Sequence, residues 1–110
     1  MVLVSLDEAK NYLRVDSSDD DALIGVLLTS AKRLCADVAR LDADQWAVVS
    51  GESENDDLYT DEELERIQEV MKVAVLYTLG YLYEHREEAD HHDLTLTLRS
   101  LLFAVREGVF

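Results

Sequence analysis

The chain has 110 residues, of which 48% are apolar, and its 24 acidic and 10 basic residues give a formal net charge of −14. This length suits one domain, and this apolar fraction is normal for a packed core, so a folded chain is expected and wholesale disorder is disfavoured. A surface this acidic repels phosphate, which disfavours binding to DNA through a basic face and binding to an acidic membrane surface.

The first predicted element is a short helix that begins after Ser5. Ser5 and Glu8 have the spacing of a capping box, in which the serine hydroxyl and the glutamate carboxylate each accept a backbone amide. The acidic run at residues 16–21 ends this helix and starts the next one, because the N-terminal end of a helix favours carboxylates. One apolar stripe predicts about two turns, and it consists of Leu6, Ala9 and Leu13.

A long amphipathic helix is predicted from about Asp20 to Leu41. Its apolar residues recur at the spacing of a helix with one buried face, and they are Ile24, Leu27, Leu28, Ala31, Leu34, Cys35 and Val38. Cys35 is the only cysteine, so no internal disulfide can form and a reducing compartment is expected. Because Cys35 lies on the buried stripe, we interpret it as a structural thiol, not a nucleophile.

Residues 42–60 are predicted to form a flexible acidic loop. They include six acidic residues and no lysine or arginine, and residues 50–57 contain Gly51, serine and asparagine. An apolar island at residues 46–49 inside this loop predicts one turn of helix or a short strand. Connections this long are often functional in compact domains.

The main helix is predicted to start at a second capping box, Thr60 to Glu63, and to reach Glu84. From Val73 onward it is apolar nearly all round, so two of its sides must be covered. The longest uncharged apolar-rich run, residues 73–83, has 11 residues, well short of the ~20 that span a bilayer. No basic signal sequence precedes Ser5, so a soluble, intracellular protein is expected. The predicted apolar face consists of Leu64, Ile67, Val70, Met71, Ala74, Val75, Thr78, Leu79 and Leu82.

A last helix is predicted near the C-terminus, with Leu96, Leu98, Leu101, Leu102 and Val105 as its apolar residues. Residues 94–98 alternate like a strand, but five residues cannot form a sheet alone. The predicted fold class is therefore all-α. We expect a single domain, residues 1–110, built as a bundle of about four helices: one short N-terminal, two long and one short C-terminal, with the acidic loop between the second and third.

No catalytic, metal-binding or cofactor-binding residue is predicted. His85, His91 and His92 lie in an acidic segment, but their spacing fits no zinc motif, so we interpret this segment as a solvated helix end. The run at residues 16–21 lacks the glycine and glutamate positions of a calcium loop. The sequence also contains no phosphate-binding loop and no recognisable catalytic triad.

Side chains suited to protein contacts are the remaining candidates, because tyrosine, tryptophan and arginine are enriched in interface cores. Tyr77, Tyr81 and Tyr83 lie near the end of the main helix, and core packing explains at least one of them. Gly80 beside them predicts a close helix crossing. The candidate interface residues are Trp46, Tyr81, Tyr83, Arg86, Arg106 and Phe110.

The order of these motifs resembles the head–tail connector family of tailed bacteriophages. Residues 5–16, SLDEAKNYLRVD, look like the start of that family, and residues 19–38, DDDALIGVLLTSAKRLCADV, are similar to its second element. The likeness is strongest over residues 73–106, where a helix that ends in tyrosine, glutamate and arginine precedes a leucine-rich helix that ends in arginine. This chain has Thr97 or Ala104 where the family often has proline, and residues 50–57 match no family pattern.

The resemblance implies a structural, non-enzymatic protein that forms a ring, twelvefold in the virion, beneath the portal protein. The ring would extend the DNA channel without sequence-specific binding, and it would dock a neck or tail-completion protein. An acidic channel would let the duplex slide, because like charges repel. Residues 46–60 and 107–110 are the expected docking segments. Assembly would take place in the host cytoplasm, and the final location would be the virion neck.

Two other functions stay open. A small acidic adaptor or regulatory module could bind a basic protein as a monomer or dimer, and its binding would then depend strongly on salt. A metal-dependent enzyme that uses His85, His91 and His92 would retain stoichiometric metal after dialysis.

Overall fold

The computed structural model describes residues 3–85 and 92–107, and within these ranges it contains six helices and no strand. They are α1 (Leu6–Leu13), α2 (Asp21–Val38), α3 (Ala43–Ser50), α4 (Asp61–Glu84), α5 (His92–Leu101) and α6 (Phe103–Glu107). The all-α prediction is confirmed, but the predicted number of four helices is wrong. One additional helix lies in the predicted acidic loop, and the other arises because the last helix is broken at Leu102.

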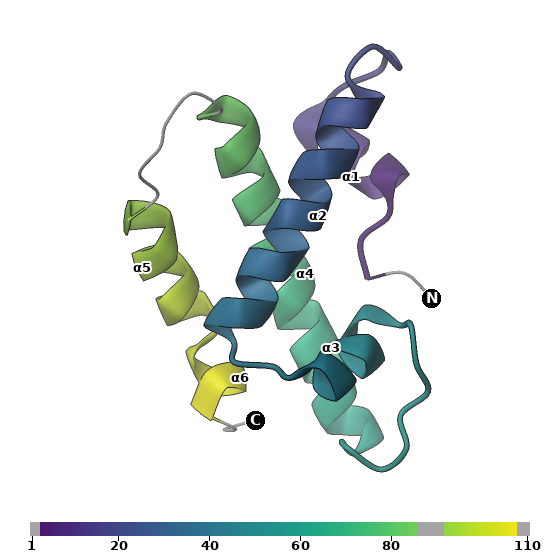
Figure 1. Cartoon of the computed structure of the whole chain (residues 1–110), viewed down its shortest axis with the longest axis vertical. Helices are drawn as coiled ribbons and strands as arrows, with labels where there is room; N and C mark the ends of the chain where they lie inside the picture. The colour runs from purple at the N-terminus through teal and green to yellow at the C-terminus, as the bar shows by residue number, and fades with distance from the viewer. Residues whose placement is uncertain (1–2, 86–91, 108–110) are drawn as a thin grey trace.

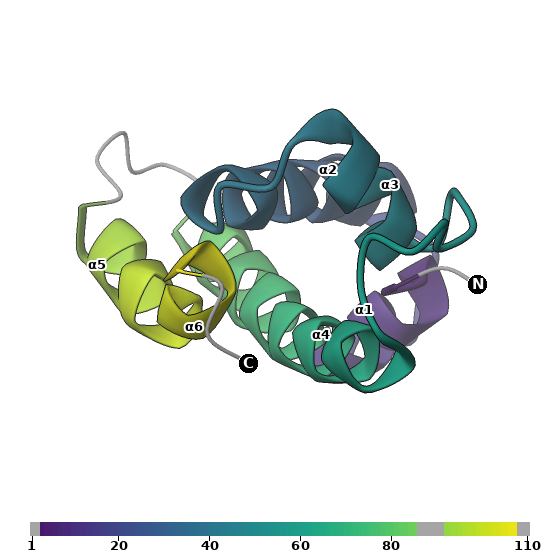
Figure 2. The same ribbon diagram turned by 90° about the horizontal axis from the view of Figure 1, so that it is seen from below.

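The two long helices, α2 and α4, form the centre of the molecule (Figure 1). α1 packs against both of them at one end, and α5 packs against both of them on another side. In Figure 2, α2 and α3 lie above α4, while α5 and α6 stand beside it. The described part of the chain is thus two helical layers, with α2 and α3 on one face and α4 on the other.

The core fills the seam between these helices. The predicted stripes of α2 and α4 are buried or partly buried there, which confirms both patterns. In α5, the buried residues Leu94 and Leu98 are four positions apart, whereas Leu96 between them is 46% exposed. The leucines that alternate like a strand in sequence therefore belong to a helix with one buried side. The largest fully buried side chains in the two long helices are those of Ile24, Cys35, Ile67, Met71, Val75, Thr78 and Leu79.

Local capping sequences set the starts of three helices. Ser5 accepts the amide of Glu8 at 3.1 Å before α1, and Thr60 accepts the amide of Glu63 at 3.1 Å before α4. In both cases the glutamate side chain bonds back to the backbone amide of the cap residue, so both predicted capping boxes are confirmed. A third box, formed by Asp42 and Gln45 with a 2.8 Å bond, starts α3. It satisfies helix-end amides that would otherwise lack partners.

The prediction of a loop over residues 42–60 is wrong for Ala43–Ser50, which is α3. The apolar island at residues 46–49 belongs to this helix, and its buried residues Val48 and Val49 face inward. The helix ends at Gly51, whose φ of 89° is the left-handed conformation that glycine adopts most readily. The irregular connection is therefore limited to residues 51–60, and its flexibility stays a prediction.

Gly80 lies where α1 meets α4, as the predicted close approach required. A Cβ atom at Gly80 would lie 3.1 Å from Cε2 of Tyr12, whereas a Cβ atom at Gly25 in α2 would meet nothing within 4 Å. Gly25→Ala is therefore expected to raise the free energy of unfolding by about 0.5–1 kcal/mol, because alanine is the better helix former. Gly80→Ala is expected to gain less, since the Tyr12 ring must shift. Urea unfolding of both variants tests this, and equal gains would contradict the contact.

Candidate interaction surfaces

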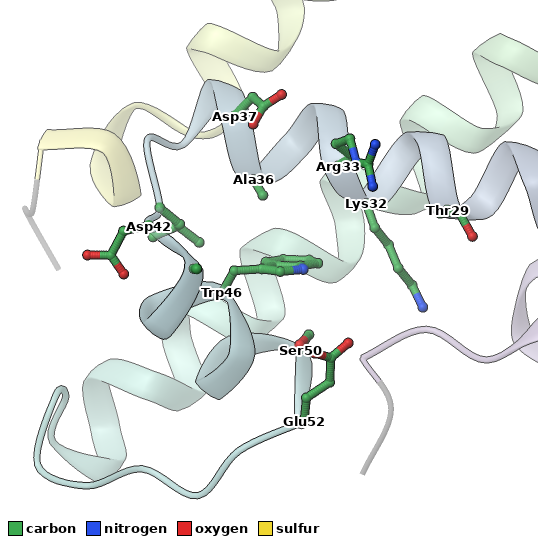
Figure 3. Close-up of a pocket in the computed structure, with 12 residues that line it drawn as sticks. Thr29, Lys32, Arg33, Ala36, Asp37, Asp42, Trp46, Ser50 and Glu52 are labelled. Carbon is green, nitrogen blue, oxygen red and sulfur yellow. The ribbon is translucent and has the colours of Figure 1, made fainter.

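A pocket of about 600 Å³ lies between α2 and α3, and we call it the α2–α3 pocket. Trp46 projects from α3 toward α2, while Lys32 and Arg33 are carried by α2 (Figure 3). Ala36 and Ser50 supply small, buried surfaces beside the indole. The pocket therefore contains a tryptophan and an arginine, two residue types that are enriched where proteins bind one another. Its other charged lining residues are Lys32, Asp37, Asp42 and Glu52.

Lys32 is the unusual charge in this pocket. Its side chain is partly buried, and this burial lowers the pKa of its ammonium, while the nearby carboxylate of Glu52 acts in the opposite direction. The chain's other two lysines form ion pairs, Lys10 with Asp21 at 2.8 Å and Lys72 with Glu8. Within residues 3–85 and 92–107, Lys32 has no carboxylate at ion-pair distance. A partly desolvated cation of this kind gains free energy when an anion reaches it.

A groove lined by tyrosines lies between α1 and the C-terminal part of α4, with a volume of about 690 Å³. Tyr81 stacks on His85, with ring centroids 4.2 Å apart and planes inclined by 21°. His85 also bonds through Nδ1 to the carbonyl oxygen of Tyr81 at 2.9 Å. Tyr83 donates its hydroxyl to Asp20 at 3.1 Å, which ties the end of α4 to the start of α2. The predicted residues Tyr81 and Tyr83 therefore share one groove, which Tyr77 and Tyr12 also line.

The outer side of α5 and α6 exposes large apolar side chains. Leu96, Leu101 and Phe103 are 46%, 40% and 54% exposed. Arg106 lies with its guanidinium carbon 5.9 Å from the centre of the Phe103 ring, and it contacts Glu107 at 3.2 Å. The predicted candidate Arg106 thus lies beside the exposed ring of Phe103, which was not among the predicted interface residues. The helical spacing from the buried Leu94, Leu98 and Leu102 could have placed Leu96 and Phe103 on this outer side.

The predicted residues Arg86 and Phe110 lie outside the described residues, as does His91. In the part of the chain that the structure describes, no group of three or more histidine, cysteine, aspartate or glutamate side chains is arranged to hold a metal ion. No helix in those ranges is both long and apolar enough to cross a bilayer. The His85 ring instead packs on Tyr81 and bonds to the carbonyl oxygen of that residue at the end of α4.

Cys35 lies in the seam between α2 and α4, where its sulfur is 3.5 Å from Oγ1 of Thr78. Thr78 in turn donates its hydroxyl to the carbonyl oxygen of Ala74 at 2.8 Å. Burial raises the pKa of the Cys35 thiol to about 11, so the thiol stays protonated at neutral pH. The side chain is fully buried, and this is the structural role that its position on the stripe predicted.

Comparison with known proteins adds one finding. A family model described as "Phage gp6-like head-tail connector protein" matches residues 3–107, a span that contains all six described helices. No curated protein and no solved structure matches the chain significantly.

Proposed function

This chain belongs to the phage gp6-like head-tail connector family, and from that membership we propose that it is a ring-forming subunit beneath the portal protein. The family is structural and non-enzymatic, so membership implies contacts with other phage head and tail proteins at the virion neck. The match over residues 3–107 is the observation that carries the proposal, because it spans the folded domain and not one motif.

The distribution of exposed apolar groups supports contacts with other phage proteins. The tyrosine groove lies between α1 and α4, whereas Leu96 and Phe103 lie on the outer side of α5 and α6. Single exposed apolar residues are ordinary on a monomer, but clusters at two separate places favour contacts.

The charge of the chain supports its proposed relation to DNA. A net charge of −14 on each subunit multiplies around a ring, and a negative wall repels the phosphate backbone. We therefore infer that DNA passes through the channel without sequence-specific binding. The connection at residues 51–60 and the C-terminal residues 107–110 are the proposed docking segments for the portal protein and the neck or tail-completion protein.

The acidic adaptor is the second candidate, and it is favoured only by net charge. Adaptor binding through surface charge would be strongly screened by salt. An adaptor that binds through surface charge would not use the exposed apolar side chains of α5 and α6, whereas a connector would use them in contacts with other phage proteins.

Native mass spectrometry of the purified chain, alone and with its portal protein, tests the proposed function. We expect a discrete species near twelve subunits, either free or bound to the portal ring. A monomer that stays monomeric at high concentration and also fails to bind the portal protein would overturn the connector proposal. Salt-sensitive binding of a basic protein by such a monomer would favour the adaptor.

A further inference from the structure

We propose that neighbouring subunits meet head-to-tail, with an acidic face of α4 on one copy docked against the α2–α3 pocket of the next copy. The acidic face of α4 consists of Glu62, Glu65 and Glu69, which would pair with Lys32 and Arg33. This inference rests on the proposed ring and specifies which surfaces form its contacts.

The acidic face of α4 lies on the N-terminal half of that helix. Its three carboxylates are three and four positions apart, a spacing that puts them on one side of a helix. They line a shallow hollow of about 270 Å³ together with Arg66, and all of these residues are exposed. Among the ion pairs of the described residues, none uses Glu62, Glu65 or Glu69.

The α2–α3 pocket offers the complementary charge. Lys32 is partly buried beside the indole of Trp46 and has no ion pair within the described ranges. Arg33 adds an exposed guanidinium to the same rim. Three carboxylates of the same copy also line the pocket, but within the described residues none of them forms an ion pair with either cation, and Figure 3 shows two of them pointing away from Lys32. These two are Asp37 and Asp42, and the third is Glu52. A ridge of carboxylates from another molecule would supply the missing anions.

The two surfaces lie on opposite sides of the domain. α2 turns its buried stripe toward α4, and Arg33 is on the other side of α2 because Ile24, Leu28 and Cys35 occupy the inner side. The acidic face of α4 is likewise opposite that helix's buried residues Ile67 and Met71. Figure 2 shows the pocket-forming helices α2 and α3 above α4. Complementary surfaces on opposite sides join copies in a head-to-tail series, which closes into a ring where the rotation permits.

The proposed contact would offset the repulsion between copies. Each copy has a net charge of −14, so copies repel one another and associate only where their surfaces carry complementary charges. Exposed ion pairs individually contribute little, so the indole of Trp46 is expected to supply apolar contact and the charges to set the register.

Charge reversal on each surface provides the test, with ring formation measured by native mass spectrometry and with the portal protein added if the unchanged chain requires it. K32E/R33E and E65K/E69K should each lower the ring fraction at least tenfold. An equimolar mixture of the two should restore rings in which they alternate, because each reversed surface then meets its complement. E65K/E69K changes the net charge of each copy from −14 to −10, because each replacement of glutamate by lysine adds two positive charges. If only the general repulsion between copies mattered, this variant would assemble better than the unchanged chain.

A charge-matched variant and folding measurements complete this experiment. R40E/R99E makes the same change in net charge as K32E/R33E but at exposed arginines outside the pocket, and it should still form rings. Far-UV circular dichroism of each variant verifies that it is folded, and recovery in the mixture verifies it again. Rings formed by K32E/R33E alone and by E65K/E69K alone would overturn the inference while leaving the connector function intact. A wild-type chain that never assembles would overturn the function itself.

Zero-length carbodiimide cross-linking of mixed ¹⁴N and ¹⁵N copies gives an independent measurement. Lys10 and Lys72 are occupied by ion pairs, so Lys32 is the lysine best placed to react between subunits. We expect peptides that join Lys32 of one isotopic copy to Glu62, Glu65 or Glu69 of the other. Rings in which Lys32 is joined only to Glu52 of its own copy would contradict the contact.

Discussion

Replacing Leu98 with alanine is expected to lower the free energy of unfolding by about 2–5 kcal/mol. The Leu98 side chain is completely buried and belongs to the row formed with Leu94, Leu102 and Val105. This row holds α5 against α2 and α4, and Val105 of α6 belongs to the same core. Small domains have a total stability of about 5–15 kcal/mol, so one truncation here removes a large share of it. Urea unfolding followed by far-UV circular dichroism measures the loss.

Leu96→Ala is the matched control for this prediction. It makes the same chemical change on the same helix, but Leu96 is 46% exposed, so the expected loss is below about 0.5 kcal/mol. Similar losses for the two variants would contradict the packing of α5. Amide hydrogen exchange adds a local measurement, because Leu98→Ala should speed exchange in α5 more than in α2.

Raising the pH from 9 to 11 is expected to remove about 2 kcal/mol of stability through Cys35 alone. Its pKa rises from an ordinary value of 9.0 to about 11 in the folded protein, chiefly because the thiol is buried. Well below pH 9 the thiol is protonated in both states and contributes no pH dependence. Above pH 9 the unfolded chain loses the proton and gains free energy, while the folded chain keeps it, so stability falls with pH.

Urea unfolding of the unchanged protein and of Cys35→Ala at pH 8, 9, 10 and 11 isolates this contribution. Tyrosine and lysine ionise in the same range, and the comparison cancels their contribution because both proteins contain them. The alanine variant should be less stable at pH 8, and the gap should narrow as the pH rises. Parallel curves would show that the Cys35 thiol ionises as easily in the folded state as in the unfolded one.

Three helices could be predicted from local sequence because two kinds of signal agreed for each. A capping box and an apolar stripe predicted α1 and α4, and an acidic start and a stripe predicted α2. α3 was predicted only as one turn of helix or a short strand at residues 46–49, because it is just two turns long and its buried residues, residues 48–50, are consecutive in sequence and give no helical period. The pairing of Asp42 with Gln45 was the available signal, and the high acidic content of residues 42–60 hid it.

The break between α5 and α6 has no local signal. No proline or glycine lies near Leu102, and the buried side chain there continues the apolar row of α5. The capping residues that begin the earlier helices have no counterpart before Phe103. Such a break depends on how the C-terminal residues pack against the rest of the domain, and propensity and pattern do not determine that packing.

The candidate surfaces were only partly predictable for a related reason. Trp46 was selected by residue type, and it does line a pocket. Lys32 and Arg33 were not selected, because the sequence does not show that α3 packs beside them. Tyr83 was selected as an interface residue, yet its hydroxyl bonds to Asp20, 63 positions away in the chain. Contacts between distant segments decide all of these cases.

The position of the single tryptophan makes it an intrinsic fluorescence probe of the α2–α3 pocket. Trp46 is the only indole in the chain, so all tryptophan emission arises from one wall of the α2–α3 pocket. Indole emission shifts in colour and intensity when water leaves its ring or a carboxylate approaches. Stopped-flow fluorescence can therefore time the filling of this pocket in the unlabelled protein, separately from events elsewhere in the molecule.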